Sequence, residues 1–389
     1  MLNTAFEPWP SFTKEEADAV SNVLLSNKVN YWTGQECHEF EKEFAQFAGT
    51  QYAVALANGT VALDVALKAL GIGEGDDVIV TSRTFLASAS SIVTAGANPI
   101  FADVELDSQN ISAQTIQAVL TPNTKAIICV HLAGWMCDMD PIMQLAHDKG
   151  LYVIEDCAQA HGAQYKGKLA GSIGHIAAWS FCQDKIMTTG GEGGMVTTND
   201  EELWKKMWSY KDHGKNFDSI YNKQHPPGFR WLHDSFGTNW RMMEMQAVIG
   251  RIQLTKMPEW TKKRKDHTDI ILNAFENSPY FTVHRPSNNY VHACYKCYVQ
   301  VNIEKLPEGW SRDRIMQEIN ASGVPCFSGS CSEVYLEHAF DHTAWRPEKR
   351  LANAQMLGET SLMFLVHPTL SLDSLNKTVA SIQQVINQL

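Results

Sequence analysis

Short apolar runs alternate with helix-like segments along the first half of the chain. The runs expected as strands are residues 52–56, 77–80, 99–104, 125–130, 152–156, 177–181 and 193–199. Four segments of about ten residues between them, 60–70, 85–96, 112–120 and 139–150, have helical patterns. This alternation predicts an α/β fold, in which helices cover both faces of a mostly parallel sheet of seven strands.

Further helical patterns lie on both sides of this region. Thr13 and Glu16 form a capping box, which starts a helix that continues to about residue 27. The remaining elements are expected as a helix from about 36, a helical and aromatic-rich stretch over 201–251, a long helix from about 256, a strand over 294–303, a helix over 311–322 and a last helix from about 373. We therefore predict a large α/β domain over residues 1–255 and a smaller α+β domain over residues 256–389.

The composition narrows the class of protein. The 389 residues carry a net charge of −11 and form no long basic stripe, which argues against nucleic acid as a partner. No apolar run approaches the ~20 residues that span a membrane, and the N-terminus has no signal-peptide pattern. Nine cysteines, an odd number, are scattered through apolar segments and fit a reduced interior. These features predict a cytoplasmic protein that binds neither nucleic acid nor a membrane.

The sequence context argues against a metal site and against the common nucleotide-binding motifs. Cys294 and Cys297 form a CxxC pair in a segment that alternates like a strand, where residues three apart point to opposite faces. No second pair at zinc-finger spacing follows, so we expect no metal site. The glycine-rich run 190–194 is expected as a turn between strands. No phosphate-binding glycine motif opens a helix after a strand, which argues against the common nucleotide-binding folds.

Polar residues come after the strands at one predicted rim of the sheet. An open α/β sheet binds its ligand at the carboxyl ends of its strands. The residues at or just after those ends are Asn58-Gly59-Thr60, Thr84-Phe85, His131, Asp156 with Gln159 and His161, and Ser180 with Lys185. The sheet is expected to gather these residues into one site.

Two of these residues supply the central chemistry of pyridoxal phosphate. This cofactor needs an amine that forms an imine with its aldehyde, and Lys185 offers one. It also needs a carboxylate that keeps the pyridine nitrogen protonated, so that the ring can accept electrons, and Asp156 offers one.

Other residues at the same rim suit the rest of the cofactor. Gly59 and Thr60 open a helix whose free N–H groups and dipole favour a phosphate, and Ser180 adds a hydroxyl. Phe85 can stack on the ring, and Gln159 can form a hydrogen bond with the ring oxygen.

Each residue also has an ordinary structural explanation. Asp156 can end a strand, residues 58–60 can cap a helix, and Phe85 can lie in the core. His131 and His161 are more often buried histidines with satisfied hydrogen bonds. The agreement of order, strand-end placement and chemical type favours the cofactor site.

Three segments resemble one protein family. They are residues 153–181, the Lys185 stretch that ends in GGEGGMVTTND, and GTNWRMMEMQAVIGRIQL at 237–254. These segments are similar to the DegT/DnrJ/EryC1/StrS family of pyridoxal-phosphate-dependent nucleotide-sugar aminotransferases. The resemblance extends from about Pro10 to the C-terminal helix, and it implies the fold type I architecture.

The resemblance also implies roles for the site residues. Lys185 would bind the cofactor covalently, Asp156 would pair with its ring nitrogen, and Gln159 would lie near its ring oxygen. The phosphate would be held by Gly59, Thr60 and Ser180.

Three further residues are implied to serve the substrate or a second subunit. Asn239 would reach the phosphate of the neighbouring subunit's cofactor. Arg241 would face the sugar nucleotide or the carboxylate of the donor, and Trp32 would line the substrate cleft. The resemblance therefore implies a homodimer with shared active sites.

The expected reaction moves an amino group from an amino acid, L-glutamate by the resemblance, to a keto group of a nucleotide-linked deoxysugar. We expect a UDP-linked 4-keto-6-deoxy sugar and a place in surface polysaccharide or glycan biosynthesis. A 3-keto sugar, a pyridoxal-phosphate-dependent dehydratase or lyase, and a non-catalytic cofactor-binding regulator are the alternatives. Relatives that act as dehydratases replace the lysine with histidine, whereas Lys185 is present here. Residues 322–337 depart from the family's nucleotide-binding pattern, so the nucleotide, the sugar and the face of amine addition stay open.

Overall fold

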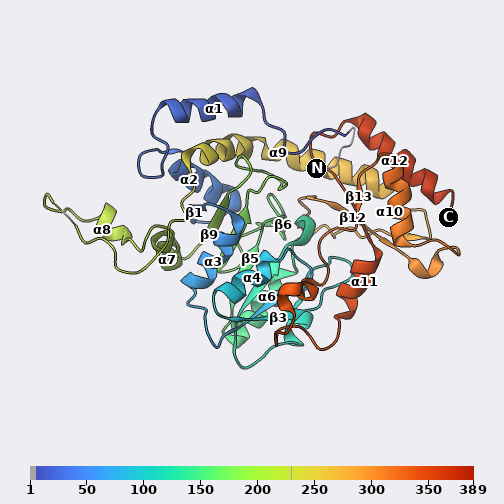
Figure 1. Cartoon of the computed structure of the whole chain (residues 1–389), viewed down its shortest axis with the longest axis horizontal. Coiled ribbons are helices and arrows are strands. Elements are labelled where there is room, and N and C mark those ends of the chain that lie inside the picture. The colour runs from blue at the N-terminus through green and yellow to red at the C-terminus, as the bar shows by residue number, and fades with distance from the viewer. Residues whose placement is uncertain (1–5, 229) are drawn as a thin grey trace.

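A seven-stranded sheet lies at the centre of the computed structural model, which describes residues 6–228 and 230–389 (Figure 1). In spatial order its strands are β1 (Tyr52–Leu56), β9 (Gly194–Thr198), β8 (Ile176–Ser180), β5 (Tyr152–Asp156), β4 (Thr124–Val130), β2 (Asp77–Thr81) and β3 (Asn98–Ala102). Only β9 runs against its neighbours, and all other pairs are parallel. The predicted mostly parallel sheet of an α/β fold is confirmed.

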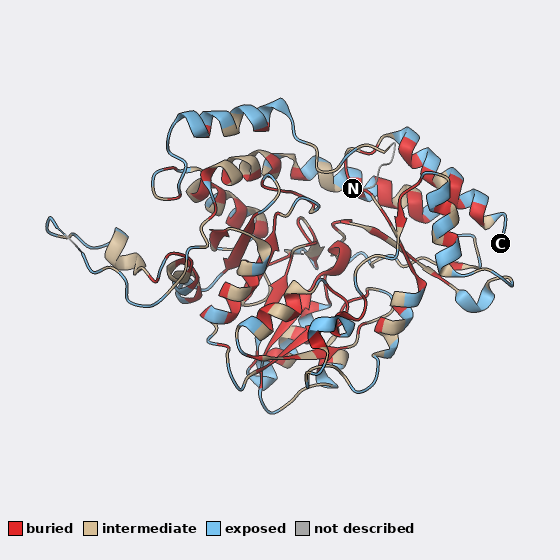
Figure 2. Cartoon of the chain, viewed as in Figure 1, coloured by how far each residue is buried: buried red, intermediate tan, exposed pale blue. Residues whose placement is uncertain are grey.

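Helices cover both faces of this sheet, as the alternation of elements predicts. One face packs against α2 (Glu36–Ala48), α5 (Ala113–Gln117) and α6 (Met139–Lys149), and the other against α3 (Gly59–Ala69), α4 (Ala87–Thr94) and α7 (Glu201–Lys211). Along β4, Ile127 lies in the first apolar cluster and Ile128 in the second. The strands are mainly apolar because most of their residues are buried on both faces of the sheet (Figure 2).

A smaller antiparallel sheet lies toward the C-terminus. Its apolar core is separate from the two clusters that flank the central sheet. Its strand order is β10 (Phe281–Thr282), β12 (Cys297–Val301), β14 (Ser361–Phe364) and β13 (Cys326–Phe327), and its helices are α10 (Arg312–Ala321), α11 (Ala352–Thr360) and α12 (Leu372–Ile386). A third sheet joins β11 (Tyr290–Val291) to β6 (Gln164–Tyr165) and β7 (Lys168–Leu169). Because β11 pairs with β6, the C-terminal region is tied directly to the loop after β5.

A long helix connects the two regions. This helix, α9 (Glu244–Asn273), runs along one side of the molecule, and α1 (Lys14–Leu25) packs on it (Figure 1). The capping box of α1 is confirmed, with the carboxylate of Glu16 accepting a hydrogen bond from the Thr13 N–H at 2.7 Å. The predicted domain boundary at residues 255 and 256 falls inside α9, and the division itself stays a prediction.

Two segments differ from the sequence expectations. The stretch 201–251 is helical only in part: α8 (Phe217–Tyr221) follows α7, and no regular helix or strand occurs over 222–228 or 230–243. Pro226, Pro227 and Gly228 lie in this segment and disfavour a helix there, because proline removes a helix hydrogen bond and glycine has a low helix propensity. The expected strand 294–303 is also shorter, since β12 begins at Cys297. None of the helices in the described part of the chain combines the length and apolarity needed to cross a membrane.

Candidate active site

The carboxyl ends of β1, β5 and β8 meet at a cavity of about 610 Å³. Seven of the predicted site residues line it, namely Gly59, Thr60, Phe85, Asp156, Gln159, Ser180 and Lys185. The volume lies in the range of roughly 300–1,000 Å³ that small-molecule sites occupy. The sheet thus brings residues from distant parts of the sequence to one rim, as the strand-end argument predicts.

The first turn of α3 forms an anion-binding corner of this cavity. Asn58 caps the helix by accepting a hydrogen bond from the Val61 N–H at 3.0 Å. Gly59 and Thr60 begin the helix, so their N–H groups have no acceptor within it. A Cβ on Gly59 would lie 2.6 Å from the Cβ of Ser180, and glycine is therefore required for this close approach. The corner combines free N–H groups, the positive end of a helix dipole and a hydroxyl.

Asp156 ends β5 as a buried carboxylate with two hydrogen-bond donors. Its Oδ2 accepts a hydrogen bond from Ser88 Oγ at 2.8 Å, and its Oδ1 accepts one from the Ala158 N–H at 3.1 Å. Burial raises the pKa of Asp156, and the two hydrogen bonds and the charge of Lys185 offset only part of that rise. A positively charged ligand atom beside Asp156 would stabilise its ionised form.

Lys185 lies in the loop between β8 and β9, with its side chain only 18% exposed. Its Nζ is 3.2 Å from Asp184 Oδ1 and 5.4 Å from the centroid of the Tyr295 ring. Burial alone would raise the pKa of Asp184, but Lys185 and the Tyr295 hydroxyl lower it. The indole N–H of Trp9 donates to the Lys185 carbonyl at 2.8 Å. Lys185 is therefore held at the cavity by contacts of both its backbone carbonyl and its side-chain amine.

Gln159 and Phe85 complete the cavity wall in different ways. Gln159 is 8% exposed, and its Oε1 accepts a hydrogen bond from the Ala133 N–H at 2.7 Å. Phe85 precedes α4 and is 71% exposed, although it lines the cavity. The alternative explanation of Phe85 as a core residue is therefore wrong, since a large apolar side chain this exposed is not packed in the interior.

The cavity fits pyridoxal phosphate by the chemistry of its side chains. It presents a primary amine, a buried carboxylate that lacks a cationic partner at hydrogen-bond distance, and a cradle of helix N–H groups that a Cβ on Gly59 would fill. An exposed aromatic ring at the wall offers a stacking surface. These are the groups that hold an aldehyde, a pyridinium, a phosphate and a ring face.

The three other predicted residues lie outside this cavity. Trp32 and Arg241 belong to a group that we call the Asp212 cluster, formed by Trp32, Lys211, Asp212, Lys215 and Arg241. Asp212 Oδ1 accepts hydrogen bonds from Arg241 at 2.7 Å and Lys215 at 3.0 Å, and Lys215 Nζ lies 4.0 Å from the Trp32 ring centroid. The backbone of Asn239 pairs with that of Asp212.

The Asp212 cluster contains buried polar atoms without hydrogen bonds. No hydrogen bond from any residue that the structure describes reaches Trp32 Nε1, Lys211 Nζ, Asp212 Oδ2 or Arg241 Nε. The nearest carboxylate oxygen to Lys211 Nζ is Glu41 Oε1 at 3.6 Å. Within one chain this cluster is therefore less completely paired than the catalytic cavity.

The two buried histidines differ from each other. His131 agrees with the expectation of a satisfied histidine, because its Nε2 contacts Glu155 Oε2 at 2.9 Å and its Nδ1 accepts from the Cys137 N–H at 3.1 Å. Burial alone would lower its pKa, but Cys157 and Glu155 raise it to about 10. Neither nitrogen of His161 has a hydrogen-bond partner in the described part of the chain. For His161 the expectation of satisfied hydrogen bonds is therefore wrong.

Two groups of residues could suggest a metal site, namely the His131, Glu155 and Cys157 cluster and the CxxC pair. His131, Glu155 and Cys157 have ligand atoms within 4.8 Å of one another. Both oxygens of Glu155 are already used, because they accept hydrogen bonds from the backbone of 171–174 as well as facing His131. Cys294 has a φ of 49°, so the strand geometry expected for the CxxC pair does not hold.

Several residues that support the site are not indicated by any motif in the sequence. Asp184 is adjacent to Lys185, and this neighbouring acid could have suggested an ion pair. Ser88 and Ala133 contact Asp156 and Gln159 across 68 and 26 residues of sequence, so no local pattern indicates them. The same is true of Trp9, which is 176 residues from Lys185.

Comparison with known proteins agrees with this site. Residues 10–383 match the model of the DegT/DnrJ/EryC1/StrS aminotransferase family. The chain is 36% identical over 382 residues to the GDP-perosamine synthase of Caulobacter vibrioides, and the match covers 97% of each chain. It superimposes on an aminotransferase from Psychrobacter cryohalolentis with a TM-score of 0.98 and 64% identity, covering 98% of this chain and 99% of the other.

A more distant structure shows the same architecture. DesV of S. venezuelae, solved with a ketimine intermediate, has a TM-score of 0.87 and 29% identity, and the match covers 97% of this chain and 95% of DesV. The fold is therefore that of fold type I aminotransferases. The chain belongs to the DegT/DnrJ/EryC1/StrS aminotransferase family and is a pyridoxal-phosphate-dependent sugar aminotransferase.

Proposed function

We propose that this enzyme transfers the amino group of L-glutamate to the keto group of a UDP-linked 4-keto-6-deoxy sugar, as a step in surface polysaccharide or glycan biosynthesis. The observation that carries the proposal is the cavity that joins Lys185, Asp156 and the α3 corner at one rim of the sheet. The Caulobacter relative is named for a GDP-linked sugar, so GDP is the first alternative nucleotide to test.

The cofactor-binding residues act through charge and hydrogen bonding. Pyridoxal phosphate, when bound, supplies an aldehyde that accepts an amine and a ring that takes up electrons from the reacting carbon. Gly59, Thr60 and Ser180 hold its phosphate at the helix N-terminus. Asp156 would keep the ring nitrogen of the bound cofactor protonated, because its carboxylate is buried and has only neutral hydrogen-bond donors at close range.

Three other residues position the reacting groups. Gln159 is oriented by the Ala133 N–H and faces the cavity with its amide, where it is placed to contact the ring oxygen. Phe85, which is exposed at the cavity wall, would offer a stacking surface to the ring of the bound cofactor. Lys185 removes the proton from Cα of the amino-acid donor, and Asp184 orients the amine for this transfer.

We propose that the active unit is a homodimer in which each site uses both chains. Asn239, Arg241 and Trp32 do not line the cavity that contains Lys185. Buried atoms of the Asp212 cluster lack partners within the described part of one chain. A second chain that brings these residues to its partner's cofactor phosphate and substrate would supply those partners. The isologous contact of a C2 dimer would form two identical sites.

A substrate screen tests the proposed reaction. The purified holoenzyme is incubated with glutamate and, separately, UDP-, dTDP- and GDP-linked 4-keto-6-deoxy sugars, and the products are identified by mass. The expected result is an amino sugar from the UDP-linked substrate, with one 2-oxoglutarate formed per amino group. Loss of water from the sugar without use of glutamate would instead identify a dehydratase. If none of these 4-keto sugars gives product and the corresponding UDP-linked 3-keto sugar does, the 4-keto assignment is rejected.

A further inference from the structure

Residues 6–9 join the C-terminal region of the chain to the loop that carries Lys185, and we call them the N-terminal strap. They precede α1 and form no helix or strand. Phe6 packs against the apolar core of the C-terminal region. The polar contacts of the strap lie at two places, the start of α12 and the backbone of Lys185.

The strap is anchored at the start of α12. Ser374 Oγ donates to the Glu7 carboxylate at 2.8 Å, and hydrogen bonds from Ser371 and Ser374 lower the pKa of Glu7 to about 2. Ser371 is the N-cap residue of this helix, so the charge of Glu7 also lies at the positive end of the helix dipole. Thr369 Oγ1 donates to the Pro8 carbonyl at 2.9 Å. These contacts fix the strap on the C-terminal region.

The other end of the strap contacts the backbone of Lys185. The indole N–H of Trp9 donates to the Lys185 carbonyl at 2.8 Å. The Trp260 ring meets the indole edge-on at 5.1 Å, the His367 ring stacks on it at 6.0 Å, and the Arg264 guanidinium lies 5.0 Å from its centroid. These neighbours hold the indole ring, so the direction of its N–H is fixed as well.

Other contacts fix the residues on both sides of Lys185. The Lys185 N–H donates to the Cys182 carbonyl at 3.0 Å, and the Thr188 N–H donates to Gln253 Oε1 on α9 at 2.8 Å. Residues 186–187 are fully buried. The carbonyl of Lys185 is the point at which the strap meets this loop.

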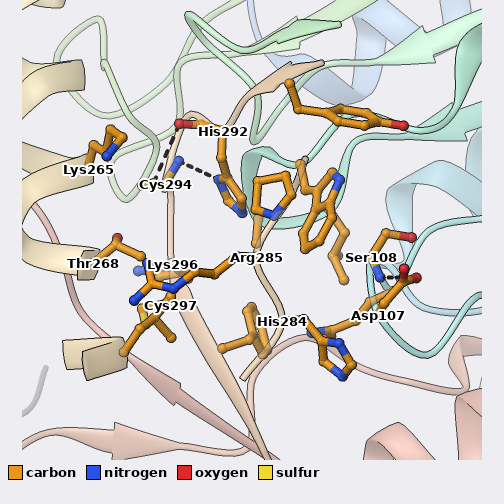
Figure 3. Close-up of a pocket in the computed structure, with 18 of the residues that line it drawn as sticks. Asp107, Ser108, Lys265, Thr268, His284, Arg285, His292, Cys294, Lys296 and Cys297 are labelled. Carbon is orange, nitrogen blue, oxygen red and sulfur yellow. Dashed lines mark hydrogen bonds between the residues drawn. The ribbon is translucent and has the colours of Figure 1, made fainter. Parts of the chain in front are cut away.

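Trp9 lies outside the catalytic cavity and outside the cavity next to it. It is not among the described residues that line the catalytic cavity. A second cavity, of about 460 Å³, lies beside the start of β12, where Lys265, Thr268 and Lys296 line it (Figure 3). No described residue of the strap lines that cavity either. An influence of Trp9 on the reaction would therefore act through Lys185 and not through contact with a ligand in these cavities.

We propose that Trp9 is a positioning residue for the proton transfer assigned to Lys185, and that the strap makes the position of this amine depend on the anchoring at α12. This inference rests on the proposed function, because it concerns how Lys185 performs its part of that reaction. A displacement of about 1 Å in a reacting group can cost roughly 10²-fold in rate. A lysine side chain is flexible, so a fixed backbone limits how far its amine is displaced.

The glutamate half-reaction of the Trp9→Phe holoenzyme tests this assignment. The change removes the N–H and keeps an aromatic ring at the same place. The rate constant at saturating glutamate should fall about ten- to hundredfold, whereas the glutamate concentration for half-saturation should change less than about twofold. A merely structural defect would lower the fraction of active enzyme and leave this rate constant unchanged.

The matched control is Trp204→Phe. Trp204 donates its indole N–H to the Ala53 carbonyl in β1 at 3.2 Å, so this variant also loses an indole–carbonyl hydrogen bond, but not the one at Lys185. It should keep the parent rate constant.

Hydrogen exchange provides a readout that does not depend on activity. In the holoenzyme, peptides that cover residues 182–188 should exchange about two- to tenfold faster in Trp9→Phe than in the parent, the effect of one lost hydrogen bond on local opening. In Trp204→Phe these peptides should exchange as in the parent.

Glu7→Ala tests whether the strap acts as a unit. This variant removes the carboxylate that accepts from Ser374 and leaves Trp9 in place. It should slow the half-reaction by about two- to tenfold. In the Trp9→Phe background the same change should add less than about twofold, because the link to Lys185 is already lost.

The proposal is overturned if folded Trp9→Phe keeps the parent rate constant, or if the rate falls while the exchange of residues 182–188 is unchanged. Parent rate and parent exchange in Glu7→Ala, or additive effects of the two changes, would overturn the link to α12, even if Trp9→Phe does not fold. The proposed function fails separately. A slowed half-reaction and faster exchange in Trp9→Phe, with no amino sugar from any substrate in the parent, would reject the sugar reaction and leave the assignment of Trp9 in place.

Discussion

In the cavity at the rim of the sheet the side chains of Asp156 and Lys185 have polar partners within one chain, whereas in the Asp212 cluster several buried atoms have no hydrogen bond. Asp156 accepts hydrogen bonds from Ser88 and Ala158, and Lys185 is paired with Asp184. In the cluster, four buried nitrogen and oxygen atoms lack any hydrogen bond within the described part of the chain. A buried polar group without a partner costs roughly 1–3 kcal/mol, so the cluster should gain partners when the functional assembly forms.

The two regions differ in where they lie in the fold. The cavity lies at the carboxyl ends of strands of the central sheet. The Asp212 cluster lies beyond α7, beside the segment that carries α8 and projects from the rest of the chain. Variants in each region test whether the cavity carries the proposed catalytic groups and whether the cluster belongs to a site shared with a second chain.

The largest effect is expected from Lys185→Ala. Without the amine the cavity loses the group proposed to take the Cα proton, so the rate of the glutamate half-reaction should fall by at least about 10³-fold. The α3 corner should still retain the cofactor through its phosphate. The measurement is the change in cofactor absorbance on mixing with glutamate, and the exposed Lys262→Ala on α9 is the control. A parental rate in Lys185→Ala would show that another group is the base.

Asp156→Asn should have the next largest effect. An amide cannot balance the charge on a protonated ring nitrogen, so the barrier should rise by about 3–4 kcal/mol, which corresponds to roughly 10²–10³-fold in rate. Burial already raises the pKa of Asp156, and a neutral side chain is therefore compatible with the fold. Single-turnover rates and thermal melting of this variant are compared with those of Asp148→Asn on the surface. Near-parental kinetics would reject the ring-nitrogen role.

His161→Phe tests a buried histidine that packs against the rings of Trp179 and Phe181 and makes no side-chain hydrogen bond with a described residue. Burial, Lys185 and Arg264 lower the pKa of His161 to about 3, whereas the unfolded chain has the ordinary value near 6.5. Between these values the unfolded state binds a proton that the folded state does not, so stability falls as the pH falls below 6.5. From this group the parent should lose roughly 2 kcal/mol between pH 7 and pH 5, and His161→Phe should lose that much less.

Urea unfolding of the two proteins at pH 7 and pH 5 measures this difference. His147→Gln, at an exposed position on α6, should keep the parental dependence on pH. If His161→Phe loses as much stability on acidification as the parent, then the folded protein does not hold His161 in its neutral form. His161 would then have a hydrogen-bond partner in the assembled protein.

The smallest expected effect is the activity recovered when two inactive variants are mixed. This experiment tests directly whether a second chain completes each site. If each site uses Lys185 of one chain and Arg241 of the other, a mixed dimer of Lys185→Ala and Arg241→Ala contains one site with both defects and one with neither. Random pairing of equal amounts should then restore up to about a quarter of the parent activity per total site. Tagged subunits report exchange. No recovery after complete exchange would place both residues in the site of one chain.

Much of the fold and of the catalytic cavity could be predicted from local sequence. Strands buried on both faces must be apolar along their whole length, so the seven runs stand out, and a parallel sheet must gather the residues at their carboxyl ends along one rim. Gly59, Asp156, Ser180 and Lys185 could be named for that reason. Their chemical types then indicate the cofactor, although the role of each remains a prediction.

The differences from expectation occur where the deciding interaction is not local. The helix expected from about 256 begins at Glu244, because the helical pattern does not show where the packing against α1 and α2 begins. The CxxC segment alternates like a strand from 294, but hydrogen bonds from residues 293 and 295 to the loop after β4 bring the chain through a positive φ at Cys294.

By itself, the sequence determined the order of the elements, the sheet and the residues at its rim, because hydrophobic periodicity and strand-end position are local properties. Only the tertiary structure decided which groups hold those residues. Ser88 reaches Asp156, Ala133 reaches Gln159 and Trp9 reaches Lys185 through contacts between segments far apart in the chain. The second cavity and the Asp212 cluster arise in the same way, since an empty volume or an unpaired buried atom exists only when several segments pack together.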